Sequence, residues 1–423
     1  MRFHKYPDFN EYIKSKYRWA YEEYPYAMLV LDKPIRDWES GKQGRAIRNI
    51  KSSTNFNIRK LAYCEYVKNV SLIARSEKTP GIYVSASRFE QMEDIVKDVA
   101  DEIGHNIFDR DEKKRLIGKL TLKGVIPHAF VLRRKKSTEE ILSSFDKVIN
   151  GRSKSLKKLN KIVELNVKEI KSVISRLGIK CMVTQGDGTV QASVVCRAAK
   201  ELGVKYISVA HGYIQNPYLI SICPIRGDYL LTWTKSQKED IKNVISESEK
   251  GKVKYIGCPK HIGVNLESDK FKNALFVSEP INSKLSDERY MNYLHRTKEV
   301  MEEKFNDYSF RLHHKESDEV IQYLKSKGFS ISENELINDL AKYDVVLGSN
   351  TSALFESAYV GNPTFQVKEL ARFNFDGVNT MSIEKLRRVL SSRDNIVAAS
   401  SHNSLPKYSE AYIKKRITNI IAE

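Results

Sequence analysis

The sequence predicts an α/β protein made of two doubly wound, Rossmann-like domains that face a cleft. From Ile179 onward, short apolar runs alternate with amphipathic helical stretches, which is the pattern of a parallel sheet wound by right-handed crossovers. The alternation is interrupted at residues 259–272 and then begins again. A chain of 423 residues is also long enough for two domains. We therefore expect one sheet before the interruption and a second sheet after it.

The elements expected before the interruption follow from runs of apolar residues with period 2 or 3.6. Strands or extended segments are expected at 27–31, 81–85, 123–132, 179–184, 204–210, 229–233 and 253–256. Helices are expected at 88–103, 137–149, 155–177, 191–202 and 236–245. Gly178 and Gly203 follow two of these helices, as is common at helix ends.

After the interruption the same alternation continues to the end of the chain. Strands or extended segments are expected at 274–277, 308–312, 329–332, 345–347 and 364–367. Helices are expected at 287–305, 318–327, 333–343, 382–390 and 407–421. One more helix is expected before Gly361, because apolar residues recur at helical spacing from Leu354 to Tyr359.

The composition indicates substantial hydrophobic cores and an anionic partner. Hydrophobic residues make up 41% of the chain, and 71 Lys and Arg against 53 Asp and Glu give a net charge of +18. Such an excess suits nucleic acid, acidic lipid or an anionic substrate. No zinc-finger spacing, RNA-binding motif or aromatic–basic repeat is present, so a nucleic-acid partner is disfavoured.

The sequence carries no marks of export or membrane insertion. No stretch approaches the length of a membrane span, and residues 1–17 lack the apolar core of a signal peptide. The five cysteines show no paired metal spacing, and Cys181 and Cys196 lie in apolar patterns. We therefore expect buried free thiols and a cytoplasmic protein.

The stretch from Gly348 to Ser352 is the first candidate for a binding site. The residues Gly348, Ser349, Asn350, Thr351 and Ser352 stand between a buried strand and a helix. Free N–H groups and the helix dipole attract an anion at such a helix start, and hydroxyl groups can donate hydrogen bonds to phosphate. The alternative is an ordinary helix cap, since Ser and Thr are common caps.

Two residues at strand ends of the first half are candidates for catalysis. His211 follows an apolar strand and precedes Gly212, so it is placed to take a proton from an acceptor hydroxyl. Asp187 lies between two glycines after the preceding strand, where it acts as base, orients His211, holds an acceptor hydroxyl or only stabilises a turn.

The second half offers further candidates for nucleotide binding. His313, His314 and Lys315 follow a strand and can neutralise a leaving phosphate. Because adjacent side chains point in different directions, we expect only one of the two histidines to face the site. Glu335 precedes a helix and can accept hydrogen bonds from a ribose or base, although glutamate is also common at helix starts.

Several familiar motifs are absent from the sequence. There is no phosphate loop of the G-x-x-x-x-G-K type, no HExxH and no G-x-S-x-G elbow, and no Asp-x-Asp in the sequence suggests a metal-bound diphosphate. These absences disfavour an NTPase, a zinc hydrolase and an α/β-hydrolase. We expect no metal site and no cofactor other than an activated donor that serves as substrate.

Residues 178–367 resemble bacterial glycosyltransferases of the GT-B architecture that build capsules, lipopolysaccharides and teichoic acids. The resemblance is carried by AHGY at 210–213, LHHKE at 312–316 and GSNTSALFESAYVGNP at 348–363. VSEPI at 277–281 and ENELI at 333–337 look most like the sialyltransferase-like branches that use CMP-activated acidic sugars. A glycerophosphotransferase-like branch shares the same plan.

The resemblance implies roles for the candidate residues. The strand-end His211–Gly212 pair faces the acceptor, while a His-Pro motif and the serine-rich turn bind the nucleotide phosphate. Here the proline is replaced, since the sequence reads His313-His314-Lys315, so either histidine is the counterpart. The implied domains are an acceptor-binding domain (1–265), a nucleotide-sugar-binding domain (266–400) and a C-terminal helix (401–423) that packs back on the first.

The resulting expectation is a glycosyltransferase of capsule or lipopolysaccharide synthesis. Its partners are a nucleotide-sugar, a glycan or lipid-linked acceptor, and the acidic inner face of the plasma membrane, to which the basic surface binds. Three alternatives stay open: a CDP-glycerol-type polyol-phosphate transferase, a UDP-sugar epimerase on the same two-domain plan, and a basic nucleic-acid-binding protein.

Overall fold

The computed structural model divides into two compact units. The first comprises Met1–Ile256 together with Ile413–Glu423, and the second comprises Gly257–Tyr412. Among the described residues, no helix is both long and apolar enough to cross a membrane. The structure describes residues 6–39, 81–85, 90–104, 106–108, 154–185, 190–210, 212, 224–262, 264–266, 271–281, 284–314, 316–400, 405 and 409–423.

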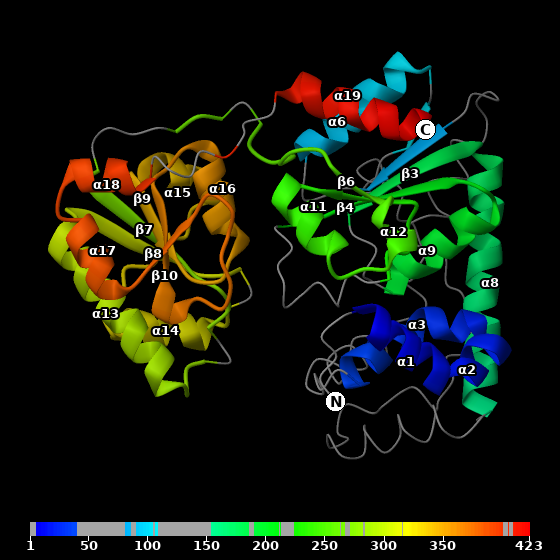
Figure 1. The fold of residues 1–423 in the computed structure, drawn as a ribbon, viewed down its shortest axis with the longest axis horizontal. Helices are drawn as coiled ribbons and strands as arrows, with labels where there is room; N and C mark the ends of the chain where they lie inside the picture. The colour runs from blue at the N-terminus through cyan, green and yellow to red at the C-terminus, as the bar shows by residue number, and fades with distance from the viewer. Residues whose placement is uncertain are drawn as a thin grey trace. The chain divides into compact units, whose positions relative to one another are not determined.

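The described part of the first unit is built on a six-stranded parallel sheet with the order β2-β1-β3-β4-β5-β6 (Figure 1). Its strands are β1 (Gly81–Ser85), β2 (Asn106–Phe108), β3 (Ile179–Gln185), β4 (Lys205–Val209), β5 (Tyr229–Thr232) and β6 (Val253–Tyr255). The connecting helices are α6 (Glu90–Glu102), α8 (Lys154–Arg176), α9 (Val190–Glu201), α11 (Lys235–Lys242) and α12 (Glu247–Lys250). Met182, Ile207 and Leu231 are fully buried, as expected for a parallel sheet covered by helices.

Among the described residues, three helices precede this sheet: α1 (Tyr6–Lys16), α2 (Arg18–Glu23) and α3 (Pro25–Glu39). The strand predicted at 27–31 is wrong, because these residues lie within α3. Pro25 is tolerated at the first helical position, and the buried Ala27, Leu31 and Ile35 recur at helical spacing. The helix is joined to α8 at its start, where the N–H groups of Tyr26 and Ala27 both donate to one side-chain oxygen of α8 (2.8 and 3.0 Å).

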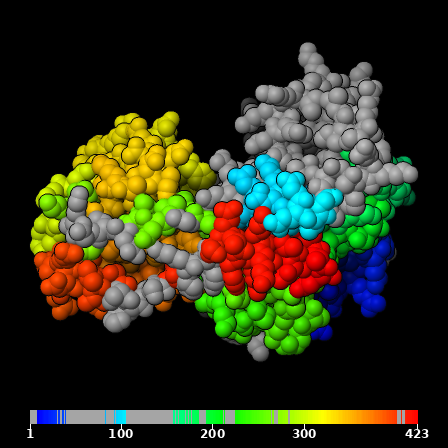
Figure 2. Space-filling view, turned by 90° about the horizontal axis from the view of Figure 1, so that it is seen from above, coloured from blue at the N-terminus to red at the C-terminus, as the bar shows by residue number. Residues whose placement is uncertain are grey.

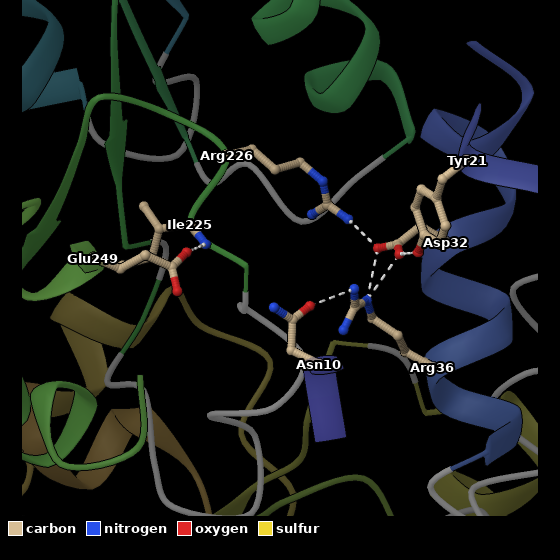
Figure 3. Close-up of polar contacts among 7 residues, drawn as sticks. All are labelled: Asn10, Tyr21, Asp32, Arg36, Ile225, Arg226 and Glu249. Carbon is tan, nitrogen blue, oxygen red and sulfur yellow. Dashed lines mark hydrogen bonds and ion pairs between the residues drawn. The ribbon is translucent and has the colours of Figure 1, made fainter. Parts of the chain in front are cut away.

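A buried carboxylate joins α3 to the segment before β5 (Figure 3). Both oxygens of Asp32 lie 2.9 Å from Arg36 Nε, and Arg226 Nη2 lies 3.2 Å from Asp32 Oδ2. Burial raises the pKa of Asp32, but the charges of Arg36 and Arg226 outweigh this effect and hold the pKa below its ordinary value. The N-terminal helices are therefore an integral part of the first unit.

The last helix, α19 (Glu410–Ala422), packs on the first unit through Ile413, Ile417 and Ile420, which are buried at helical spacing. Figure 2 shows it (red) against α6 (cyan), where Lys414 Nζ lies 2.7 Å from a carboxylate oxygen of α6. Lys205 on β4 donates to the carbonyls of residues 420 and 421 (3.1 and 2.8 Å). A cation at the last carbonyls stabilises a helix end.

The second unit holds a five-stranded parallel sheet among its described residues, with the order β11-β10-β9-β7-β8. Its strands are β7 (Asn273–Val277), β8 (Asp307–Arg311), β9 (Val345–Gly348), β10 (Thr364–Val367) and β11 (Asn379–Met381). The helices are α13 (Glu288–Lys304), α14 (Asp318–Ser326), α15 (Leu336–Lys342), α16 (Ser352–Val360), α17 (Ile383–Val389) and α18 (Arg393–Ser400). One core, from Ala274 to Ile396, joins the sheet to α13, α14, α17 and α18.

Local chemistry sets where these helices begin and end. Asp287 and Ser317 cap α13 and α14, because their side chains accept hydrogen bonds from the first-turn N–H groups. Gly361 ends α16 in the left-handed conformation, with φ of 107°, which a glycine adopts without strain.

The structure confirms the predicted fold class, two doubly wound α/β units. The division lies at residue 256 instead of the predicted 265, because the segment after β6 contacts α16. Residues up to Tyr412 also group with the second unit, beyond the predicted limit of 400. Cys181 and Cys196 are buried thiols that form no disulfide within the described part of the chain, as predicted. The predictions at 123–132 and 137–149 lie outside the described residues.

Candidate functional site

The candidate site lies at the carboxyl edge of the second sheet, where the strand order reverses. The chain passes from β7 to β8 on one side, then to β9 on the other side of β7, and onward to β10 and β11. In open parallel sheets, the two loops at such a reversal border a crevice in which ligands bind. Here those are the loops that follow β7 and β9.

Gly348, the last residue of β9, lies in close contact with the neighbouring strand β7. A Cβ atom at this position would lie 2.5 Å from the Val277 carbonyl oxygen and 2.7 Å from Val277 Cγ2. A side chain would therefore push one strand away from the other. The predicted site residue Gly348 thus allows the turn after β9 to lie close against β7.

The next two residues are bonded to the loops after β7 and β10. Ser349 is fully buried, and its hydroxyl oxygen accepts a hydrogen bond from the Glu279 N–H (3.0 Å). The Asn350 amide donates to Glu279 Oε1 (2.8 Å) and to the Leu370 carbonyl (2.7 Å), and its oxygen accepts from the Arg372 N–H (2.7 Å). This geometry favours a positioning role for both residues over direct contact with a ligand.

Thr351 and Ser352 form the start of α16. Thr351 is in the extended conformation, and its hydroxyl oxygen accepts a hydrogen bond from the Ala353 N–H (3.4 Å). Ser352 is partly buried, and its side chain makes no hydrogen bond within the described part of the chain. The first-turn N–H groups and the dipole of α16 favour an anion at this position. Of the hydroxyl groups predicted to bind phosphate, that of Ser352 is therefore the best placed to contact an anion.

His313 and His314 follow β8, and their rings lie side by side. The ring centroids are 4.3 Å apart and the ring planes are inclined by 31°. The expectation that the two side chains point in different directions is wrong, because the chain leaves the strand before His313 and turns. The Glu316 N–H donates to the His313 carbonyl (2.9 Å) and closes that turn. Strand alternation does not apply within a turn, so both rings lie on one side.

Glu335 lies beyond the outer edge of β8, where its side chain is exposed and makes no cap hydrogen bond. The turn before it is fixed by the buried carboxylate of Asp339. Asp339 accepts from the hydroxyl of Ser332 (2.7 Å), the amide of Asn334 (3.0 Å) and the guanidinium of Arg311 (2.9 Å). The structure thus presents Glu335 on a rigid turn at the same edge of the sheet as the histidines.

A buried ion pair contacts the turn after β9 through the Asn350 amide, and it was not predicted from the sequence. Lys284 contacts the carboxylate of Glu279, and its Nζ lies 4.4 Å from the centroid of the Tyr290 ring. Burial lowers the pKa of Lys284, although Glu279 opposes this shift. Burial raises the pKa of Tyr290. The spacing of these residues in the sequence gives no signal that they meet.

A second buried carboxylate, Glu356, holds the segment after β6 against α16. Glu356 accepts from Lys260 Nζ (2.9 Å), and its other oxygen lies 3.1 Å from His261 Nε2. Burial raises the pKa of Glu356, but the hydrogen bond to His261 and the charge of Lys260 hold it below its ordinary value. His261 has a φ of 56°, which is unusual for a residue other than glycine. Sequence reasoning missed this contact because its partners are far apart in the chain.

The remaining predicted site residues, His211, Asp187 and Lys315, lie outside the residues that the structure describes. Their predicted roles therefore stay predictions. Within the described ranges, no group of three or more His, Cys, Asp or Glu side chains is arranged to hold a metal ion.

Comparison with known proteins gives a likeness in fold. No family model and no curated protein match the chain. A protein of Listeria monocytogenes provisionally designated a UDP-N-acetylglucosamine 2-epimerase is 13% identical, with a TM-score of 0.51 over 82% of this chain and 96% of its own. The UDP-GlcNAc 2-epimerase of Neisseria meningitidis is 12% identical, with a TM-score of 0.48 over 81% of this chain and 99% of its own.

The wall teichoic acid polymerase TagF is 11% identical, with a TM-score of 0.40 over 93% of this chain and 96% of its own. At such identities, the likeness to the Listeria protein shows the fold alone. That fold consists of two Rossmann-like units of the GT-B type, in agreement with the sheets described above.

Proposed function

We propose that the chain is a glycosyltransferase that takes its sugar from a nucleotide-activated donor. The observation that carries this proposal is the position of α16, whose N-terminus lies at the strand-order reversal of the second sheet. Ser352 supplies a hydroxyl there, and His313 and His314 follow a strand of the same sheet. Helix N–H groups, a hydroxyl and an imidazole are groups that bind phosphate.

The donor half of the proposal assigns the phosphate to the start of α16. One of His313 and His314, with Lys315, neutralises the charge that develops on the departing phosphate. Glu335 accepts hydrogen bonds from the ribose or base. The donor we favour is a CMP-linked acidic sugar of the sialic acid or Kdo type, because of the resemblance at 277–281 and 333–337.

The acceptor half of the proposal assigns the proton transfer to the first unit. His211, or Asp187, removes the proton from the acceptor hydroxyl as the new bond forms. The acceptor is an oligosaccharide or a lipid-linked glycan of capsule or lipopolysaccharide synthesis.

With a net charge of +18, the cytoplasmic enzyme binds peripherally to the acidic inner face of the plasma membrane. Vesicles with acidic lipid should bind it in a salt-sensitive way, and equal binding to neutral vesicles would contradict this point.

A UDP-sugar epimerase is the second candidate, since the fold is shared with a protein designated a UDP-N-acetylglucosamine 2-epimerase. An epimerase converts its UDP-sugar with no acceptor present, whereas a transferase needs one. A CDP-glycerol-type polyol-phosphate transferase is distinguished by its donor, because it cleaves the diphosphate of a CDP-linked polyol, transfers the polyol phosphate to the acceptor and releases CMP.

The test is a thermal-shift panel of CMP, CDP, UDP and GDP, because a ligand that binds only the folded state raises the melting temperature by mass action. We expect the largest shift with CMP, whereas CDP would favour the polyol-phosphate transferase and UDP the epimerase. Ser352→Ala should reduce the shift. Ser326→Ala, a matched serine at the end of α14, should leave it unchanged. No shift with any nucleotide would contradict the proposal.

The acceptor half needs a separate measurement. His211→Ala should abolish sugar transfer and keep the nucleotide-induced shift, because the residue is assigned to the acceptor. Equal loss of transfer and of nucleotide binding would contradict this role.

A further inference from the structure

Glu279 contacts two consecutive residues of the turn after β9. Its backbone N–H donates to the hydroxyl oxygen of Ser349 (3.0 Å), and its Oε1 accepts from the Asn350 amide (2.8 Å). Glu279 itself follows β7, so these contacts span the strand-order reversal described above. One residue therefore fixes the turn through both its backbone and its side chain.

The carboxylate of Glu279 is itself held in place. It is 7% exposed and is paired with Lys284, which is equally buried. Lys284 in turn lies over the face of the Tyr290 ring, with its Nζ 4.4 Å from the centroid, a favourable position for a cation. A buried carboxylate without such a partner would be costly. The pairing also cancels the negative charge that would otherwise repel a phosphate nearby.

The contacts continue from Asn350 to the segment after β10. The Asn350 amide donates to the Leu370 carbonyl (2.7 Å), and its oxygen accepts from the Arg372 N–H (2.7 Å). Arg372 is exposed. Its charge adds to burial in lowering the pKa of Lys284, and it opposes the rise that burial causes in the pKa of Tyr290. The Arg372 guanidinium therefore lies near the turn, and the backbone of Arg372 is held by its hydrogen bond to Asn350.

We propose that Glu279 is a positioning residue of the donor site. It sets the turn before α16 and, through Asn350, the backbone of Arg372, so that the start of α16 and the Arg372 guanidinium are presented to one anionic group of the donor. Glu279 does not touch the donor. This inference rests on the proposed function, because it assigns the anionic group to a nucleotide.

The first experiment measures the turn without any nucleotide. In Glu279→Ala, amide hydrogen exchange should become faster at residues 349–353, because the contacts that order the turn are lost. The matched control is Asp344→Ala. Asp344 is also buried in the second unit, but it accepts from the N–H groups of Lys272 and Asn273 at the opposite, amino edge of the sheet. Asp344→Ala should speed amide exchange at Lys272 and Asn273 and leave the exchange rates at 349–353 unchanged.

The second experiment measures the dissociation constants of CMP, CDP, UDP and GDP. Glu279→Ala should weaken binding of the preferred nucleotide about tenfold, as when one charge-assisted hydrogen bond that orders a site is lost. Glu279→Gln should restore most of this affinity, because the amide oxygen of the new side chain can replace Oε1 as the acceptor from the Asn350 amide. Asp344→Ala should lower stability and leave the dissociation constant unchanged.

A double-mutant cycle keeps the inference testable when one variant folds poorly. Asn350→Ala removes the other half of the same contact, so Glu279→Ala should add little to its effect on nucleotide affinity. Additive losses would overturn the inference, as would unchanged exchange at 349–353 in Glu279→Ala or an equal loss of affinity in Asp344→Ala. Absence of nucleotide binding to the unaltered chain, with faster exchange in Glu279→Ala, would instead overturn the proposed function.

Discussion

At the scale of single residues, the fold and the candidate site meet at Gly348. A Cβ atom there would lie 2.5 Å from the Val277 carbonyl oxygen, closer than a Cβ atom approaches a non-bonded neighbour in folded proteins. We predict that Gly348→Ala lowers the free energy of unfolding of the second unit by about 1–3 kcal/mol, as overpacking of a core does. Because β9 must shift, nucleotide affinity should fall as well. Urea unfolding followed by far-UV circular dichroism measures the first effect.

The matched control for this variant is Gly251→Ala. Gly251 has an ordinary helical backbone, with φ of −63°, and a Cβ atom there would meet nothing within 4 Å. It should therefore be neutral or stabilise the chain by about 0.4–1 kcal/mol through the unfolded state. If Gly348→Ala were as stable as the unaltered chain, the turn after β9 would not be held in close contact with β7.

The candidate turn was predictable from residue types, but its contacts were not. Small and hydroxyl-bearing residues between a buried strand and a helix identify an anion-binding turn. That Ser349 is buried and that Asn350 is bonded to Glu279 and Arg372 depends on residues up to 71 positions away in the sequence. The contact of Glu356 with Lys260 and His261 spans up to 96 positions. No local pattern encodes such pairs.

At the scale of elements, α19 shows how a helix far along the chain completes the first unit. Ile417 is 1% exposed against that unit, and Arg416 next to it donates to the Tyr255 carbonyl (2.9 Å). We predict that Ile417→Ala lowers the free energy of unfolding of the first unit by about 2–5 kcal/mol, as a buried truncation does. Tryptophan fluorescence measures this effect, because Trp19, Trp38 and Trp233 all lie in the first unit.

Asn419→Ala is the control on the same helix. Its side chain is exposed, and alanine has the higher helix propensity, so the fluorescence transition should stay within about 0.5 kcal/mol of the unaltered chain. If Ile417→Ala were as stable as the unaltered chain, α19 would not contribute to the core of the first unit.

Elements were predictable where the hydrophobic period was clear. From Ile179 to β10, each predicted strand is present, while the extended segment expected at 329–332 forms only an isolated bridge between Ile331 and Phe310. Buried parallel strands appear as short apolar runs between glycine-marked helix ends. The N-terminal helices were missed, since Ala27 to Leu31 is an apolar run that fits a strand as well as a buried helix face. The short edge strands β2 and β11, with three residues each, are too brief to give a periodic signal.

At the scale of the whole molecule, the two units have separate sheets, and only one of them contains tryptophan. The core of the second unit consists of residues between Ala274 and Ile396, whereas the three tryptophans report on the first unit. The two unfolding transitions can therefore be followed separately, by fluorescence for the first unit and by calorimetry for both.

This separation gives a direct test of where the nucleotide binds. At a nucleotide concentration of about 100 times the dissociation constant, a ligand stabilises the folded state by about 2.7 kcal/mol, which raises the melting temperature of a unit of this size by about 5–10 °C. If the start of α16 holds the phosphate, that rise should appear in the calorimetric transition of the second unit. The tryptophan transition should move much less. An equal shift in both signals would place the nucleotide against the first unit as well and contradict a site built from the second sheet alone.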